Sequence, residues 1–367
     1  MSSDESMEDE LEIRETFKNS HEDLITHIAL DITGRRMATC STDKTLAIWN
    51  RDDLGKWFRI ARWKCHSGAV LRAAWAHPEF GQVLATCSCD RSVHIWEAIK
   101  NDKGVYPKWI RRAYLTDSRN AVTDIVFAPR HLGLQLATCS VQGVLRIYEA
   151  QDTMDLTRWS LNQELKAFHW RCSTVAWSPS PIHCPLVVVG SDEMKDVRNK
   201  PEDRLVVYEL NDSYRKFRRI TELKPELPSA VTDIQFNPVY QGEYHQIAIA
   251  AGDIFIYNFK VPANAFIDED GDRMPITTRT EYQSTRIAQL GMGDIKKAWR
   301  IRFNLTGNVL VASSGDGTVR IFKALFSNQW VQLTDVNTEA YLEESGQHNK
   351  TYSKGETCSV SYAQPLL

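Results

Sequence analysis

One segment of the chain occurs three times at nearly equal spacing, and this repetition constrains the fold more than any other feature of the sequence. Residues 36–49 read RMATCSTDKTLAIW, residues 83–96 read VLATCSCDRSVHIW, and residues 135–148 read QLATCSVQGVLRIY. Each copy is a small-residue apolar strand, a short polar turn and an alternating strand that ends in an aromatic residue. This pattern is typical of a β-hairpin.

Three fainter copies follow, at residues 187–208, 247–257 and 309–322. The aromatic residues that close the six hairpins are Trp49, Trp96, Tyr148, Tyr208, Tyr257 and Phe322. Alternating strands precede them at 25–30, 70–75, 122–127, 173–177, 231–236 and 299–303, and more polar strands follow, for example at 57–63, 109–115, 217–223, 280–290 and 329–333. Four strands per repeated unit are typical of a WD-repeat blade. We therefore predict an all-β, six-bladed WD-repeat β-propeller.

Small side chains recur at matching positions of the first three hairpins, as expected where sheets pack closely. The cysteines among them, Cys40, Cys87 and Cys139, are interpreted as small buried hydrophobic residues. Cys65-His66 replaces the usual Gly-His pair, and the turns where such blades place an acid that binds a histidine contain Asp43, Asp90, Asp192 and Asp316. We expect this network to be structural.

The order of the elements predicts three regions: an acidic arm at 1–20 with one candidate strand at 11–17, a propeller at 21–333, and a polar tail at 334–367 that we expect to be disordered. Six blades leave two alternatives for the ring. The strand at 11–17 closes it, or the ring stays open and exposes two sheet faces that a partner must cover by donating strands.

Composition argues against several classes of function. With 44 basic and 47 acidic residues the net charge is −3. Proteins that bind nucleic-acid phosphates usually have an excess of basic residues, so we predict no specific nucleic acid as partner. The acidic opening is unlike a secretory signal, and the apolar run at 186–189 is too short for a transmembrane segment. The cysteine usage fits a reduced cytosolic or nuclear setting.

Motifs of catalysis and metal binding are also weak. The sequence contains no nucleophile elbow, P-loop or dinucleotide-binding glycine motif, so we predict no catalytic residue, no cofactor and no small-molecule substrate. A zinc set of His169, Cys172, His183 and Cys184 is disfavoured because the segment between them reads as an inner strand, and the acidic run at 268–272 does not fit a calcium loop. We predict no metal. Basic segments lie at 108–112, 215–219 and 296–300, and the first two are interpreted as outer strands with one solvated face.

Several stretches are more specific than the pattern that all WD-repeat blades share. They are GRRMATCS at 34–41, WAHPEFGQVLA at 75–85 and VTDIVFAP at 122–129, with HSG at 66–68, WSL at 159–161 and SSGDG at 313–317. With these stretches the chain resembles the WD-repeat family of the small nucleoporin Seh-one and its relative, the secretory coat protein Sec-thirteen. The resemblance covers about residues 21–322 and is strongest over the first three blades. The acidic opening and the loop at 262–279 depart from it.

The resemblance implies an open six-bladed propeller that is completed by a blade from an α-solenoid nucleoporin. It further implies a scaffold role in the Y-shaped subcomplex of the nuclear pore coat, with other Y-complex nucleoporins as partners, and a second role in the amino-acid-sensing complex that regulates TOR signalling. The implied locations are the nuclear pore and nuclear envelope, with the kinetochore and the lysosomal surface as further ones. The alternatives are a secretory-vesicle coat propeller and a closed-ring signalling adaptor.

An open ring would place the partner-binding residues on the first and last blades. From the topology we predict an interface of Leu11, Ile13 and Phe17 on the N-terminal strand, Leu24 and Ile25 on the first blade, and Trp299, Ile301 and Phe303 on the sixth.

Overall fold

The fold is given by a computed structural model of the 367-residue chain. The structure describes residues 20–100, 106–192, 203–211, 215–239, 244–260, 282–293, 297–325 and 329–337. The predicted strand at 11–17 and the residues of the tail beyond 337 lie outside these ranges.

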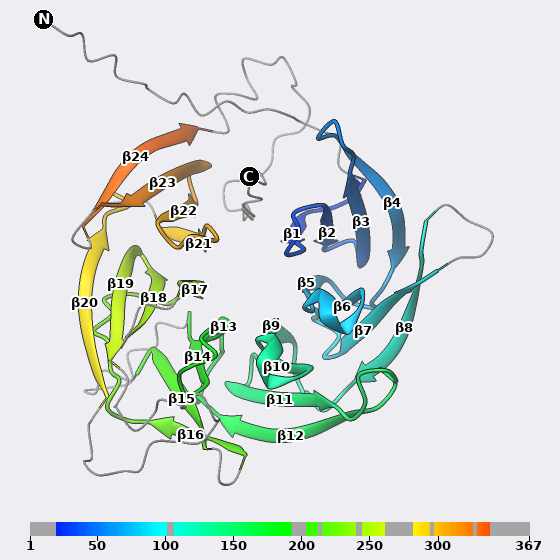
Figure 1. Ribbon diagram of the computed structural model, residues 1–367, viewed down its shortest axis with the longest axis horizontal. Coiled ribbons are helices and arrows are strands. Elements are labelled where there is room, and N and C mark those ends of the chain that lie inside the picture. Colours follow the sequence, from blue (N-terminus) through cyan, green and yellow to red (C-terminus); the bar gives the residue numbers. More distant parts are fainter. Residues whose placement is uncertain are drawn as a thin grey trace, which may run out of the picture.

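The described chain forms six antiparallel four-stranded sheets arranged around a central axis (Figure 1). Each sheet, or blade, consists of four strands that are consecutive in sequence, with the first strand innermost and the fourth at the periphery. The strands are β1 (Ile25–Leu30), β2 (Arg36–Ser41), β3 (Thr45–Arg51) and β4 (Trp57–Lys64) in blade one; β5 (Val70–Trp75), β6 (Val83–Ser88), β7 (Val93–Ile99) and β8 (Lys108–Leu115) in blade two; β9 (Val122–Phe127), β10 (Gln135–Ser140), β11 (Val144–Ala150) and β12 (Trp159–Lys166) in blade three; β13 (Thr174–Trp177), β14 (Leu186–Gly190), β15 (Leu205–Asn211) and β16 (Lys216–Ile220) in blade four; β17 (Asp233–Phe236), β18 (Tyr244–Ala251), β19 (Asp253–Lys260) and β20 (Gln283–Leu290) in blade five; and β21 (Ala298–Phe303), β22 (Val309–Ser314), β23 (Thr318–Ala324) and β24 (Trp330–Asn337) in blade six. Single 3₁₀ turns, η1 (Pro78–Phe80) and η2 (Arg130–Leu132), follow β5 and β9.

The predicted fold class is confirmed: the described chain is an all-β propeller with six blades. The three clear hairpins become β2–β3, β6–β7 and β10–β11, and the strand expected ahead of each appears with the predicted bounds as β1, β5 and β9. The repeat is legible in the sequence because the same register is used each time, with Cys40, Cys87 and Cys139 in equivalent positions.

The outer strand of blade six is longer than the sequence analysis predicted. We expected a strand at 329–333 and a tail from 334, whereas β24 continues to Asn337. The boundary is therefore corrected to 337 for the described chain. Three of the four added residues are polar, and backbone pairing holds the segment: Thr334 pairs with Ile321 and Asn337 with Thr318. Hydrogen bonding of an edge strand leaves little trace in a hydrophobicity pattern.

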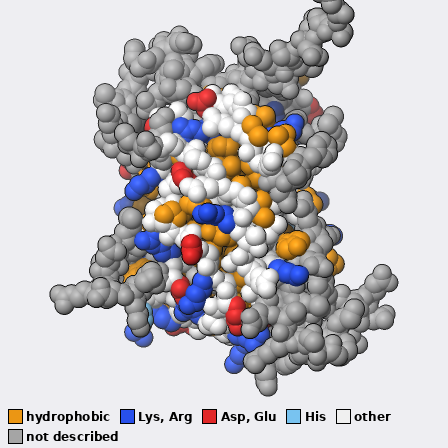
Figure 2. Space-filling model, turned by 90° about the vertical axis from the view of Figure 1, so that its left-hand side faces the viewer, with side chains coloured by type: hydrophobic (Ala, Val, Ile, Leu, Met, Phe, Trp, Pro, Cys, Tyr) orange, Lys and Arg blue, Asp and Glu red, His pale blue; other side chains and the backbone are white. Residues whose placement is uncertain are grey.

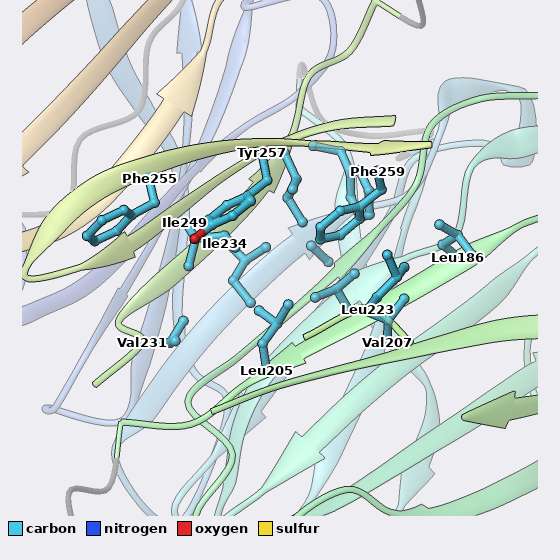
Figure 3. Packing of buried hydrophobic residues seen from close by; sticks show 14 of the residues in the cluster. Leu186, Leu205, Val207, Leu223, Val231, Ile234, Ile249, Phe255, Tyr257 and Phe259 are labelled. Carbon is cyan, nitrogen blue, oxygen red and sulfur yellow. The ribbon is translucent and has the colours of Figure 1, made fainter. Parts of the chain in front are cut away.

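The blades are joined by apolar side chains that project from both faces of each sheet. Figure 3 shows the junction of blades four and five, where Leu205 and Val207 from β15 lie opposite Ile234, Tyr257 and other residues of blade five. Similar clusters join blades one and two, two and three, three and four, and five and six. Cys40, Cys87 and Cys139 are fully buried in these junctions, in agreement with their interpretation as small core residues.

The ring is not closed by the described residues. The innermost strands contact one another in the order β1, β5, β9, β13, β17 and β21, but no comparable contact joins β21 to β1 within the described chain, and Figure 1 shows blades six and one standing apart. Each sheet contains strands from one repeat only, so within the described chain no blade is shared between the two ends. The predicted open ring is consistent with this arrangement.

The outer surface mixes hydrophobic and charged side chains. Figure 2 views the molecule from the side of β20 and β24 and shows hydrophobic groups interspersed with basic and acidic ones. The part of the chain that the structure describes contains no helix with the length and apolar character needed to cross a bilayer.

Two glycines with positive φ, Gly143 in the β10–β11 turn and Gly133 in the loop between β9 and β10, test how closely the hairpin turn is packed. A Cβ on Gly143 (φ 75°) would lie 2.2 Å from the carbonyl oxygens of Phe168 and Trp170, whereas a Cβ on Gly133 (φ 79°) would meet nothing within 4 Å. We expect Gly133→Ala to cost about 1–3 kcal/mol through backbone strain alone. Gly143→Ala should cost about 1–3 kcal/mol more, because two backbone groups must move. Urea denaturation of both variants measures the difference, and equal losses would contradict the close contact.

Candidate partner-binding surface

Blades one and two each contain a buried hydrogen-bond network that begins at a histidine ahead of the innermost strand. In blade two, His66 Nδ1 lies 3.0 Å from the Asp90 carboxylate and His66 Nε2 lies 2.9 Å from Thr86 Oγ1. Trp96 Nε1 donates to the same hydroxyl at 3.0 Å. The network ties the loop before β5 to the turn and to the third strand of the blade, so His66 and Asp90 have the structural role that the sequence suggested.

Blade one repeats this network with His21, which the sequence analysis did not recognise. His21 Nε2 lies 2.8 Å from Thr39 Oγ1, to which Trp49 Nε1 donates at 3.0 Å. His21 Nδ1 lies 2.8 Å from Thr45 Oγ1 and 3.4 Å from the Asp43 carboxylate. The signal was available in the repeat, because Thr39, Asp43 and Trp49 match Thr86, Asp90 and Trp96.

Burial decides the protonation of these histidines. It lowers the pKa of His66 and of His21, and the neighbouring aspartates only partly offset this. The ring of His94 stacks on His66 with centroids 3.8 Å apart. Burial, together with the charge of His66, lowers the pKa of His94 to about 3. The histidines are therefore neutral at pH 7 and act as hydrogen-bonding groups of the fold.

Four tryptophans dominate the junction of blades one and two. The Trp63 ring from blade one lies edge-on to Trp96 with centroids 5.2 Å apart and stacks on Trp109 at 6.0 Å. Trp75 contacts Trp109 at 5.8 Å, and Trp75 Nε1 donates across the junction to the carbonyl of Ala29 at 3.0 Å. Blade two thus presents an aromatic face to the smaller residues of blade one.

Blade one carries the equivalent face on its other side. By strand register, Leu30, Met37, Trp49 and Trp57 of blade one occupy the positions of Trp75, Leu84, Trp96 and Trp109 of blade two. Met37, Ala47 and Trp49 form a cluster with Ile28, Leu30 and Trp57 that includes residues of no other blade within the described ranges. This face is turned toward the opening of the ring. We call it the blade-one face.

Blade six has its own face toward the opening, which we call the blade-six face. It is defined by β-branched residues on alternate positions of β22, β23 and β24, namely Val309, Val311, Val319, Ile321 and Val331. These five residues are not part of the cluster that joins blade six to blade five. Val331 is 44% exposed. The opening is thus bordered by a tryptophan-containing surface on one side and an aliphatic surface on the other.

The predicted interface residues are distributed over several places. Leu11, Ile13 and Phe17 lie outside the described residues. Leu24 and Ile25 are half-buried at the start of β1, and Trp299 is 37% exposed on β21. Ile301 and Phe303 are buried against blade five, on the side of β21 that faces away from the opening.

The interface prediction therefore changes for Ile301 and Phe303. Both were selected because they are apolar and lie on the edge-most repeat, but alternation along β21 turns them toward Ala248 and Ala250 of blade five. The residues with the opposite orientation are Arg300 and Arg302, which pair with Ser313 and Val311.

Within the described ranges, the residues considered as zinc ligands do not gather into a metal site. Cys172 and Cys184 are fully buried, and the ring of His183 lies edge-on to that of His245 with centroids 4.7 Å apart. Among the described residues no group of three histidine, cysteine, aspartate or glutamate side chains could hold a metal ion. A cavity of about 430 Å³ lies over the His66 network and is bordered by Lys64, Asp90 and Arg111 among others.

The fold places the chain among WD-repeat propellers. The family model described as "WD domain, G-beta repeat" matches residues 12–50, 57–97 and 293–323. A chain in the crystal structure of the mitotic checkpoint complex superposes with a TM-score of 0.56 over 82% of this chain and 74% of that chain. At 13% identity this is a likeness of fold alone.

Closer relatives identify the family. Nucleoporin SEH1 of Caenorhabditis briggsae is 50% identical over 336 residues, 90% of each chain. The Caenorhabditis elegans protein is 50% identical over 328 residues, covering 88% of this chain and 89% of its own length. Nucleoporin SEH1 of Homo sapiens is 40% identical over 316 residues, 84% of each chain. This chain belongs to the nucleoporin SEH1 family.

The buried neutral histidines make stability depend on pH. Burial and the charge of His183 lower the pKa of His245 to about 3, as for His94, whereas an unfolded histidine titrates near 6.5. Below about pH 6.5 the unfolded chain therefore binds protons that the folded chain does not, and stability falls as pH decreases toward 3. Each such histidine contributes up to about 1.4 kcal/mol per pH unit. We expect the melting temperature to be flat from pH 8 to 7 and to drop below 6.5.

Circular dichroism melts from pH 8 to 4 test this dependence. His245→Gln should reduce the slope between pH 6.5 and 4, because the variant lacks the titrating ring. A melting temperature that stays constant from pH 8 to 5 would show that these histidines remain protonatable in the fold.

Proposed function

We propose that this chain is a non-enzymatic scaffold subunit of the nuclear pore coat, where it binds an α-solenoid nucleoporin that inserts a blade into the open propeller. The observation that carries the proposal is the topology: six complete sheets, none of which combines strands from both ends of the described chain. Membership in the nucleoporin SEH1 family supports the pore as the place of action.

The geometry of the opening supports an inserted sheet. At the existing junctions one blade packs an aromatic or bulky face against the smaller residues of the preceding blade, as Trp75 and Trp96 do in the cluster that contains Ala38 and Cys40. The blade-six face is the smaller side of one such junction, and the blade-one face is the bulky side of the next. An inserted sheet would complete both junctions. A sheet between them would bury apolar surface on both sides, at about 25 cal/mol for each Å² removed from water.

The proposed scaffold role extends to two assemblies. In the Y-shaped subcomplex of the pore coat the chain would have other nucleoporins as further partners. We also propose a role as a subunit of the amino-acid-sensing complex that regulates TOR signalling, which the family resemblance supports. An inserted blade is a form of attachment that either assembly could supply.

Quantitative purification tests the proposal. The tagged full-length chain is isolated under native conditions and its partners are measured by mass spectrometry. Stoichiometric recovery of an α-solenoid nucleoporin is expected. Recovery of secretory-coat subunits in its place would favour the coat alternative, and recovery of kinases or ligase subunits without a solenoid protein would contradict insertion.

A charge on the blade-six face should weaken partner binding without harming the fold. Val331 is 44% exposed on β24, so Val331→Glu places a carboxylate where the inserted sheet would pack. We expect recovery of the solenoid partner to fall at least about tenfold, because burying an unpaired charge costs well over the 1.4 kcal/mol that a factor of ten represents. Leu161→Glu is the matched control, since Leu161 is 39% exposed on β12 of blade three. Equal recovery with both variants would contradict binding at the opening.

A further inference from the structure

One position of every innermost strand points toward the propeller axis and the next blade. We define this axial position by its register partner, which is Cys40 or the equivalent residue of the second strand. Its six occupants, from blade one to blade six, are His27, Arg72, Asp124, Thr174, Asp233 and Arg300. Hydrogen-bond acceptors stand in the odd-numbered blades and donors in the even-numbered blades.

The acceptors bind the backbone of the following blade. In each case the side chain accepts a hydrogen bond from the backbone N–H of the residue just after the next axial position. The N–H of Ala73 donates to His27 at 3.4 Å, that of Val175 to Asp124 at 3.1 Å, and that of Ile301 to Asp233 at 3.0 Å. The donors bind the acceptor of the blade ahead. Arg72 Nε lies 3.1 Å from Asp124, and the Thr174 hydroxyl lies 3.5 Å from Asp233.

Arg300 breaks this order because no described blade follows it. Its Nη1 turns back to Asp233 of the preceding blade at 3.4 Å, and Arg302 already binds that carboxylate at 2.7 Å. Arg300 is therefore the donor of the series whose forward acceptor is not supplied by the described chain.

The axial cluster also carries unbalanced charge. Three arginines, Arg72, Arg300 and Arg302, face two carboxylates, Asp124 and Asp233, and their side chains are at most 28% exposed. Burial, the Arg72 charge and the Arg302 charge lower the pKa of Arg300 to about 9. Burial, together with the charges of the same arginines, keeps the pKa of His27 well below its usual value. Nη1 of Arg72 is buried and has no hydrogen-bond acceptor among the described residues.

We propose that the strand inserted between β21 and β1 carries an aspartate or glutamate in register with Arg300, so that its carboxylate pairs with Arg300 as Asp124 pairs with Arg72. The inference rests on the proposed function and specifies the chemistry of the partner. The partner's carboxylate would balance the third arginine of the axial cluster. It would also fix the register of the inserted strand, because a shift by one residue turns the side chain to the other face.

Binding of the co-purified α-solenoid subunit to the full-length chain tests the pairing. Arg300→Gln should weaken the complex by about 30-fold or more, the effect expected when one member of a buried charged pair is removed. The melting temperature of the isolated chain should stay unchanged or rise, because the substitution relieves repulsion from Arg72 and Arg302. A purely structural arginine would instead lower the melting temperature. Arg219→Gln is the control, since Arg219 forms a 2.9 Å ion pair with Asp203 on the periphery of blade four.

A charge exchange completes the test. Cross-linking of the complex identifies the partner residue opposite Arg300, and its replacement by lysine should abolish binding to the wild-type chain and restore it to Arg300→Glu. Wild-type affinity of Arg300→Gln, or a partner residue that is not acidic, would overturn the pairing while leaving insertion intact. Loss of binding on changing Glu10, Glu12 and Glu15 to glutamine, with no effect of the partner's carboxylate, would show that this chain supplies the charge itself. Failure of the wild-type chain to bind any solenoid subunit would overturn both proposals.

Discussion

The packing of one sheet against the next is the interaction on which the rest of this structure depends. Each blade has apolar side chains on both faces, and four strands alone cannot remove them from water. Clusters shared by consecutive blades bury them five times around the ring. The two faces at the opening have the same design but belong to blades one and six only. Because every blade repeats the same two apolar faces, the first and last blades each keep one face that no neighbouring blade covers. A further sheet is needed to bury these two faces.

The fold could be predicted well from the sequence because every hairpin shows both the internal repeat and the alternation of side chains that is typical of strands. The register that aligns Cys40, Cys87 and Cys139 is set locally, by tight turns and small buried residues, so it is visible without a structure. The end of β24 was missed because its last residues are held by backbone pairing with β23. The role of His21 was missed because its partners Thr39 and Asp43 lie about 20 residues further along the chain, on β2 and in the turn after it.

The partner-binding surface was less predictable, for a reason that Ile301 and Phe303 illustrate. Hydrophobicity marks a residue as buried but does not say which of two neighbouring sheets buries it. On β21 both residues face blade five, and the charged pair Arg300 and Arg302 has the opposite orientation. Only the alignment of axial positions around the whole ring shows that Arg300 occupies a donor position, because its partners lie on other blades.

The opening has a direction, and this limits what can fill it. Every existing junction joins the aromatic or bulky face of one blade to the smaller face of the blade before it, and the axial donors likewise point forward. In a symmetric dimer of this chain the blade-one face of one copy could meet the blade-six face of the other, because under a twofold axis each residue i that contacts residue j is matched by j contacting i. Such a dimer would bring His27, and not a carboxylate, to the axial position that follows Arg300. A separate sheet, inserted in the same orientation as the six others and bringing a carboxylate to the axis, satisfies both the packing and the charge.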